Sequence, residues 1–172
     1  MISLLVCSRV EDNANSQLPE LLASLAYTTS NYDNFELLIK FDDDDAKAEE
    51  LISSFDQYPF QIKHRIDERS RGYVDLHLFY NRLLPMMDPK TEIIGAIADD
   101  FVFTVRGWDE IILGKRGIFE DDIFIIHGRF HPPYDRADHE GHPFNLGFNI
   151  DELEDLKIID EAPMWSRKLI DI

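Results

Sequence analysis

Short apolar runs that end in acidic or other polar residues constrain this chain most strongly. Residues 2–7, 35–41 and 92–98 are predominantly apolar, and the last two runs stop at Asp42 and Asp99. Runs of this length and composition are typical of strands buried on both faces of a parallel sheet. Residues 18–26 lie between the first two runs and carry leucines at helical spacing, with Pro19 where a first helical turn tolerates it. The pattern predicts an α/β fold.

The same alternation continues along the chain. We expect helices over residues 46–55, 73–87 and 108–113, and further strands over residues 60–66 and 123–126. Right-handed crossovers between such strands give a three-layer α/β/α sandwich with a mainly parallel, Rossmann-like central sheet. Ligands of such sheets collect beyond the carboxyl ends of the strands. We expect one domain over residues 1–172.

Charge and cysteine content exclude several classes of function. The chain has 34 acidic against 17 basic residues and a net charge of -17, which argues against a nucleic-acid partner. Its one cysteine cannot form an intrachain disulfide and fits a reducing compartment. No apolar run approaches the roughly 20 residues of a membrane span. We therefore expect a soluble, cytoplasmic protein without an integral membrane segment.

Acidic residues gather at two of the expected strand ends. Four aspartates occupy residues 42–45, and Asp99 and Asp100 follow the fourth strand. One interpretation is structural, because aspartates at such positions cap the following helix or turn. The other is a cation site, because Mg²⁺ and Mn²⁺ prefer oxygen ligands. Their place at the carboxyl ends of strands is where a ligand site is expected.

Four segments together carry a family resemblance: ISLLVCSR, FELLIKFDDDD, RSRGYVDLHLFYN and IADDFVFTVRGWDEI. They resemble the family-2-like nucleotide-sugar glycosyltransferases of the GT-A fold over most of residues 1–113. The most specific part is the acidic pair at a strand end followed by Gly-Trp-Asp-Glu. The resemblance implies that Asp99 and Asp100 bind Mn²⁺ or Mg²⁺. Ala98 stands where relatives often carry an acid, so the chain departs from the Asp-x-Asp form.

The resemblance also implies a donor site for a UDP- or GDP-linked sugar. Ser8 and Arg9 would line the nucleotide pocket, and Asp42 or Asp44 would read the base or ribose. Two further candidates are Arg71, for the diphosphate, and Asn81, for orienting the donor; both equally suit ordinary surface positions. A divalent cation would neutralise the charge that develops on the diphosphate when the glycosidic bond breaks.

The acceptor side is less defined by the sequence. The resemblance implies an inverting transferase, which needs a carboxylate base. The candidates are Asp121, Asp138 and Glu140, with Glu120 and Asp122 also available. Histidines 127, 131, 139 and 142 match no standard zinc spacing and suit a solvent-facing loop. Among them His127 is the best candidate for a third metal ligand. Trp108 is expected to pack in the core rather than to stack on a sugar.

The leading hypothesis is therefore a metal-assisted glycosyltransferase with an unknown acceptor, in which residues 1–113 form the nucleotide-sugar-binding core. Residues 114–172 would form an irregular acceptor-side region, and the short C-terminal part implies a minimal or truncated enzyme. A nucleotidyltransferase is the first alternative, although VCSRVEDNANS lacks the glycine-rich, basic phosphate loop of that class. A non-catalytic nucleotide- or carbohydrate-binding module is the second.

Overall fold

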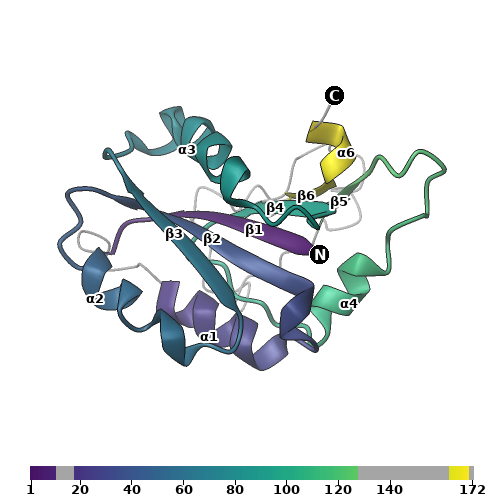
Figure 1. The fold of residues 1–172 in the computed structure, drawn as a ribbon, viewed down its shortest axis with the longest axis horizontal. Helices are drawn as coiled ribbons and strands as arrows, with labels where there is room; N and C mark the ends of the chain where they lie inside the picture. The colour runs from purple at the N-terminus through teal and green to yellow at the C-terminus, as the bar shows by residue number, and fades with distance from the viewer. Residues whose placement is uncertain (11–17, 128–162, 171–172) are drawn as a thin grey trace, which may run out of the picture.

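A twisted six-stranded sheet forms the centre of the protein in a computed structural model, which describes residues 1–10, 18–127 and 163–170 (Figure 1). The strand order is β3-β2-β1-β4-β6-β5. Strands β1 to β4 are mutually parallel, and β6 is antiparallel to both of its neighbours. The strands are β1 (Ile2–Ser8), β2 (Phe35–Asp42), β3 (Gln61–Asp67), β4 (Ile93–Ile97), β5 (Ile125–His127) and β6 (Pro163–Ser166).

Helices cover both faces of this sheet, so the predicted three-layer arrangement is confirmed. Helices α1 (Leu18–Thr28), α2 (Ala48–Ile52) and α4 (Trp108–Leu113) lie on one face, and α3 (Leu76–Leu83) and α6 (Arg167–Ile170) lie on the other (Figure 1). Alternate residues of β1 serve the two layers: Leu4 and Val6 join the core under α1, and Leu5 joins the core under α3. Burial on both sides explains why this strand is so apolar. None of the described helices is long and apolar enough to cross a membrane.

Two expected helices are shorter than their sequence patterns suggest. The helix expected over residues 46–55 is α2, followed by the 3₁₀ turn η2 (Phe55–Gln57). The helix expected over residues 73–87 is divided into the 3₁₀ turn η3 (Gly72–Val74), α3 and the 3₁₀ turn η4 (Leu84–Met86). Pro85 lies in η4 and has no N–H to donate to an α-helical hydrogen bond, which accounts for the change of helix type.

Strand β6 was not expected from the sequence. It contains only four residues, lies between β4 and β5, and joins the C-terminal part of the chain to the same sheet as residues 1–113. The strand expected over residues 123–126 is β5, displaced toward His127. Gly95 in β4 allows the close approach of β6, because a Cβ atom at this position would lie 3.0 Å from Met164 Cγ.

The segment after β4 returns to the α1 side through α4. Gly107 adopts φ of 72° and donates its N–H to the Thr28 carbonyl at 2.7 Å. Trp108 is buried edge-on against Phe35, and its Nε1 donates to Thr29 Oγ1 at 3.1 Å. The expected packing role of Trp108 is therefore confirmed. The next residue, Asp109, is fully buried and accepts bonds from the backbone of residues 30 and 31 and from the Asn34 side chain.

Candidate functional site

The carboxyl ends of the parallel strands bring together residues that are far apart in the sequence. Ser8 ends β1, and Asp99 lies two residues after the end of the neighbouring β4. Ser8 Oγ donates a hydrogen bond to Asp99 Oδ2 at 2.7 Å. On the other side of β1, Ser8 is in register with Phe41 of β2, which places Asp42 at the same edge. Two predicted site residues are thus in direct contact, and a third ends the adjacent strand.

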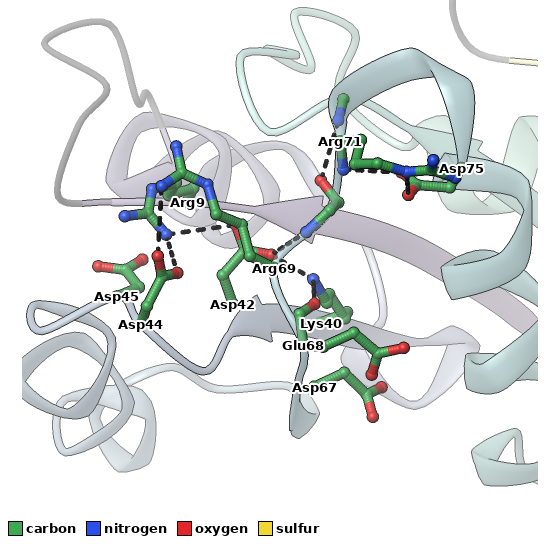
Figure 2. A network of polar contacts seen from close by, with 12 residues as sticks. Arg9, Lys40, Asp42, Asp44, Asp45, Asp67, Glu68, Arg69, Arg71 and Asp75 are labelled. Carbon is green, nitrogen blue, oxygen red and sulfur yellow. Dashed lines mark hydrogen bonds and ion pairs between the residues drawn. The ribbon is translucent and has the colours of Figure 1, made fainter.

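Asp42 is a buried anchor of this edge rather than an exposed acid. It forms an ion pair with Lys40, accepts the Ser70 N–H at 3.2 Å, and lies 3.4 Å from Arg9 Nη1 (Figure 2). Lys40 is 1% exposed and also donates to the Glu68 carbonyl at 2.9 Å. These contacts neutralise the Asp42 carboxylate and attach the loop that follows β3 to the end of β2.

Asp44 lies in the turn after β2 and joins two arginines from different segments. Arg9 donates a hydrogen bond to Asp44 Oδ1, and Arg69 Nη1 lies 3.3 Å from Asp44 Oδ2 (Figure 2). Asp44 is exposed, and the hydrogen bond from Arg9 lowers the pKa of its carboxyl group below the ordinary value. The two guanidinium groups therefore share one ionised carboxylate at the carboxyl edge of the sheet.

Asp45 has the structural role that was one interpretation of the acidic run. It is 5% exposed and accepts the Val10 N–H at 2.6 Å and the Lys47 N–H at 3.2 Å. These bonds organise the turn that leads into α2 and hold it against the segment after β1. The four consecutive aspartates are thus not equivalent, because residues 42 and 45 are buried anchors whereas residues 43 and 44 are exposed.

Arg71 and Asn81 occupy different surroundings from this network of aspartates. Arg71 binds Asp75 through both its N–H and its Nε, each at 2.9 Å, and its side chain is otherwise largely exposed (Figure 2). The hydrogen bond from Arg71 lowers the pKa of Asp75. Asn81 is exposed on α3 and lines a mainly apolar groove of about 350 Å³ together with Tyr80 and Trp165.

A salt bridge connects the end of β3 to α3. Arg82 donates to both carboxylate oxygens of Glu68, at 2.6 and 2.7 Å. This bidentate contact lowers the pKa of Glu68 to about 2. Lys40 Nζ lies 3.9 Å from the centroid of the Phe79 ring, and Arg82 Cζ lies 5.1 Å from it. The loop carrying Arg69 and Arg71 is therefore fixed at both β2 and α3.

The expected metal ligands lie at an open part of the same edge. Asp99 is partly buried and bonded to Ser8, whereas the neighbouring Asp100 is exposed. Over residues 1–10, 18–127 and 163–170, no group of three or more His, Cys, Asp or Glu side chains could hold a metal ion. Mg²⁺ and Mn²⁺ are often held by one or two carboxylates together with water and substrate phosphate. Two carboxylates would supply part of such a coordination shell and not the whole of it.

The other expected ligand and base candidates are not brought together with Asp99. His127 ends β5, and β6 lies between that strand and β4. Asp121 lies before β5, at the amino edge of the sheet, where its carbonyl accepts Lys168 Nζ at 3.1 Å. Glu120 and Asp122 share that segment. The remaining candidates lie outside the described residues, namely Asp138, Glu140, His131, His139 and His142.

A hollow of about 870 Å³ lies at the opposite, amino edge of the sheet. Its lining includes Met1, Gln61 and Thr91, and none of the residues expected to bind a ligand contributes to it. The carboxyl edge instead gathers the buried ion pair Lys40–Asp42, the two arginines on Asp44 and the Ser8–Asp99 contact. We assign the candidate site to the carboxyl edge for this reason.

Lys40 and Arg69 were not among the residues expected from the sequence. Lys40 and Asp42 are two residues apart on one strand, so strand alternation places them on the same face. That spacing is a signal from which the pair could have been recognised. The role of Arg69 depends on the fold of the loop after β3, for which the sequence contains no comparable signal.

Comparison with known proteins gives a clear answer only for the fold. No protein-family model matches the sequence, and no curated protein matches it. Among solved structures, a mannosyltransferase from Pyrobaculum calidifontis, in complex with GDP-Man and Mn²⁺, aligns with a TM-score of 0.67 and 12% identity. It covers 99% of this chain and 45% of its own. S. aureus TarS in complex with UDP aligns with a TM-score of 0.55 and 17% identity, over 76% of this chain and 38% of its own.

An enzyme of another class shares the architecture. The 4-diphosphocytidyl-2C-methyl-D-erythritol synthase from Anaerococcus prevotii aligns with a TM-score of 0.52 and 15% identity, over 99% of this chain and 71% of its own. The present chain spans less than half the length of the mannosyltransferase and TarS chains. At these identities the likeness establishes the fold alone. This chain shares with the three proteins a mixed α/β fold with a mainly parallel central sheet.

Proposed function

We propose that this chain is the donor-binding core of a glycosyltransferase that moves a sugar from a UDP- or GDP-linked donor to an unknown acceptor. The observation that carries the proposal is the 2.7 Å contact between Ser8 and Asp99, which joins two predicted site segments at the carboxyl edge. Arg9, Asp42 and Asp44 lie along the same edge. The fold likeness to a GDP-Man-bound mannosyltransferase and to UDP-bound TarS supports the same conclusion.

Each residue would act through its position at this edge. Asp99 and Asp100 would hold Mn²⁺ or Mg²⁺, and the cation would neutralise the charge of the leaving diphosphate. Ser8 donates to Asp99 Oδ2 and would so help to fix the orientation of the Asp99 carboxylate. Arg9 would contact the nucleotide, and Asp42 would fix Arg9 and the loop after β3.

Residues outside this group would bind the diphosphate, orient the donor and supply the base. Arg71 would reach the diphosphate after releasing Asp75, and Asn81 would orient the donor from α3. Inversion would require a carboxylate base, for which Asp138 and Glu140 are the stronger candidates, because Asp121 lies at the amino edge. The acidic surface makes a nucleic-acid acceptor unfavourable, since the net charge is -17.

Nucleotidyl transfer is a second candidate, favoured by the likeness to the cytidylyl-transferring synthase over 99% of this chain. That chemistry would begin with a nucleoside triphosphate, and its phosphates would need a basic, glycine-rich loop after β1. The sequence VCSRVEDNANS provides one arginine and no glycine there. Transfer of a sugar from a nucleoside-diphosphate sugar therefore fits the residues better.

Calorimetric titration of UDP and GDP, with and without Mn²⁺, tests the proposal. We expect one of the two to bind in a metal-dependent manner and Asp99→Asn and Asp100→Asn each to weaken that binding roughly tenfold or more, since each removes a charged ligand. Asp33→Asn is the matched control, because Asp33 is an exposed aspartate at the amino edge. Absence of binding by both UDP and GDP would contradict the donor site. If CTP binds in a parallel titration while UDP and GDP do not, nucleotidyl transfer is favoured.

Catalysis is tested separately from binding. Release of free sugar from the donor identified by calorimetry is expected to require the metal and to disappear in Asp99→Asn. Circular dichroism should show that the variant keeps its fold, because this partly exposed strand-end acid contributes little to the core. Donor binding without any hydrolysis or transfer would indicate a non-catalytic binding module.

A further inference from the structure

The Arg9–Asp44–Arg69 group has features of an anion site that the protein fills with its own carboxylate. Arg9 donates to one oxygen of Asp44, and Arg69 Nη1 lies 3.3 Å from the other (Figure 2). The side chains of Asp44 and Arg69 are 44% and 58% exposed, so a ligand from solvent has access to their contact. Arginine forks of this kind suit phosphate oxygens as well as carboxylates.

Contacts that do not involve Asp44 hold the Arg9 side chain and the backbone on either side of Arg69. Arg9 Nη1 lies 3.4 Å from the buried Asp42 carboxylate. Arg69 belongs to a loop whose neighbouring residues are fixed, because Lys40 binds the Glu68 carbonyl at 2.9 Å and the Ser70 N–H binds Asp42 at 3.2 Å. Arg9 and the loop that carries Arg69 would therefore keep their positions if the Asp44 side chain moved away.

Movement of the Asp44 side chain away from the arginines would also leave the rest of the turn in place. It lies in the turn between Asp42 and Asp45, both of which are 5% exposed and hydrogen-bonded to other segments. Asp43 and Asp44 are the exposed members of the run. An exposed carboxylate–guanidinium pair adds little net stability, because water and salt screen it. An anion with two or three negative charges is attracted to the same two arginines more strongly than a single carboxylate is.

We propose that Asp44 occupies, in the ligand-free protein, the binding site of the donor's diphosphate, and that the diphosphate displaces it onto Arg9 and Arg69. The inference rests on the proposed function and adds to it both a phosphate-binding residue, Arg69, and a competing internal anion. Asp44 would exclude weakly charged anions from the site, because such anions do not displace its carboxylate from the two arginines. With a net charge of -17, such a paired cation site is a favourable place for a polyanion on this surface.

Binding of inorganic pyrophosphate, titrated without divalent metal at constant ionic strength, tests this arrangement. Asp44→Asn removes the competing anion and is expected to tighten pyrophosphate binding about 2- to 5-fold, which is the range for removal of an exposed ion pair. Asp43→Asn makes the same charge change one residue away and should leave the affinity within about twofold of the wild type. Equal affinities in the two variants would overturn the proposal.

Arginine variants provide the second arm. Arg69→Gln is expected to weaken pyrophosphate binding roughly tenfold, because a charge-assisted hydrogen bond is lost. Arg116→Gln is the matched control, since Arg116 pairs with Glu92 at the amino edge, away from Asp44. Unchanged binding in Arg69→Gln would also overturn the proposal, because Arg69 would then not contact the anion.

Parallel titrations with UDP, GDP and uridine separate this inference from the proposed function. If the anion site exists but the donor site does not, the pyrophosphate results hold while neither nucleotide binds more tightly than pyrophosphate. If the donor site exists without the anion site, a nucleotide binds in an Asp99-dependent manner, but Asp44→Asn and Arg69→Gln behave like their controls. Uridine affinity should be the same in Asp44→Asn and in the wild type, because uridine carries no phosphate.

Discussion

At the scale of single residues, Lys40 is the least expected feature of this protein. Its side chain is 1% exposed near the carboxyl end of β2, where it contacts Asp42, the Glu68 carbonyl and the Phe79 ring. Burial of one charge is costly, and the opposite charge of Asp42 together with these contacts compensates it. Burial also raises the pKa of the nearby Cys7 thiol to about 12, so this thiol is neutral at physiological pH.

Replacement of Lys40 by methionine should therefore destabilise the fold strongly. The variant keeps most of the side-chain volume but leaves the buried Asp42 carboxylate with only the Arg9 guanidinium, at 3.4 Å, as a neighbouring cation. Removal of one partner from a buried ion pair typically costs about 3–5 kcal/mol of unfolding free energy. Urea denaturation followed by circular dichroism measures the difference. The double variant Lys40→Met/Asp42→Asn should recover part of the loss, because it no longer contains the uncompensated charge. A loss below about 1 kcal/mol in the single variant would mean that the pair is effectively solvated.

At the scale of elements, the loop after β3 owes its position to contacts with β2 on one side and α3 on the other. Lys40 and Asp42 hold it from β2, and Arg82 holds Glu68 from α3. The folded-state pKa of Glu68, about 2, is below its ordinary value of 4.5, because Arg82 donates to the ionised carboxylate. The stabilisation from this pair is thus fully present above about pH 4.5 and is lost as the pH falls toward 2.

Arg82→Gln should raise the pKa of Glu68 from about 2 toward 4.5. The pH window in which the β3–α3 connection weakens would then move upward, toward mildly acidic solution. Titration of the Glu68 carboxyl carbon by NMR measures the shift directly. Arg116→Gln serves as a control, because it removes an arginine at the amino edge and should leave the Glu68 titration unchanged. A Glu68 pKa that stays near 2 in Arg82→Gln would assign the shift to another group.

At the scale of the whole molecule, the net charge of -17 acts against compactness and against anionic ligands. Many of the described cations are paired locally with carboxylates, including Arg9, Lys40, Arg71, Arg82 and Arg116. The excess negative charge is consequently left on the remaining acidic groups. At the candidate site on the carboxyl edge, the guanidinium groups of Arg9 and Arg69 lie beside the aspartates that follow β2.

Added salt should therefore stabilise the protein. Raising NaCl from about 10 mM to about 150 mM shortens the screening length to roughly 8 Å and weakens the long-range repulsion among acids. We expect Tm to rise by about 2–4 °C, which corresponds to about 1 kcal/mol for a chain of this size. Differential scanning calorimetry at fixed pH measures it. A fall in Tm would show that the local ion pairs, which salt also screens, contribute more than the repulsion.

The sequence by itself determined the layered α/β architecture and the edge at which to look for a site. Apolar runs such as residues 35–41 define buried strands through local composition, and parallel pairing then places Ser8, Asp42 and Asp99 at one edge. Only the tertiary structure decided which acids are anchors and which are accessible. Asp42, Asp45 and Asp109 are chemically identical to Asp44, and their different roles follow from contacts with residues up to 79 positions away, which no local pattern encodes. Likewise β6, with four residues, is stabilised by pairing with β4 and β5 and carries almost no signal of its own.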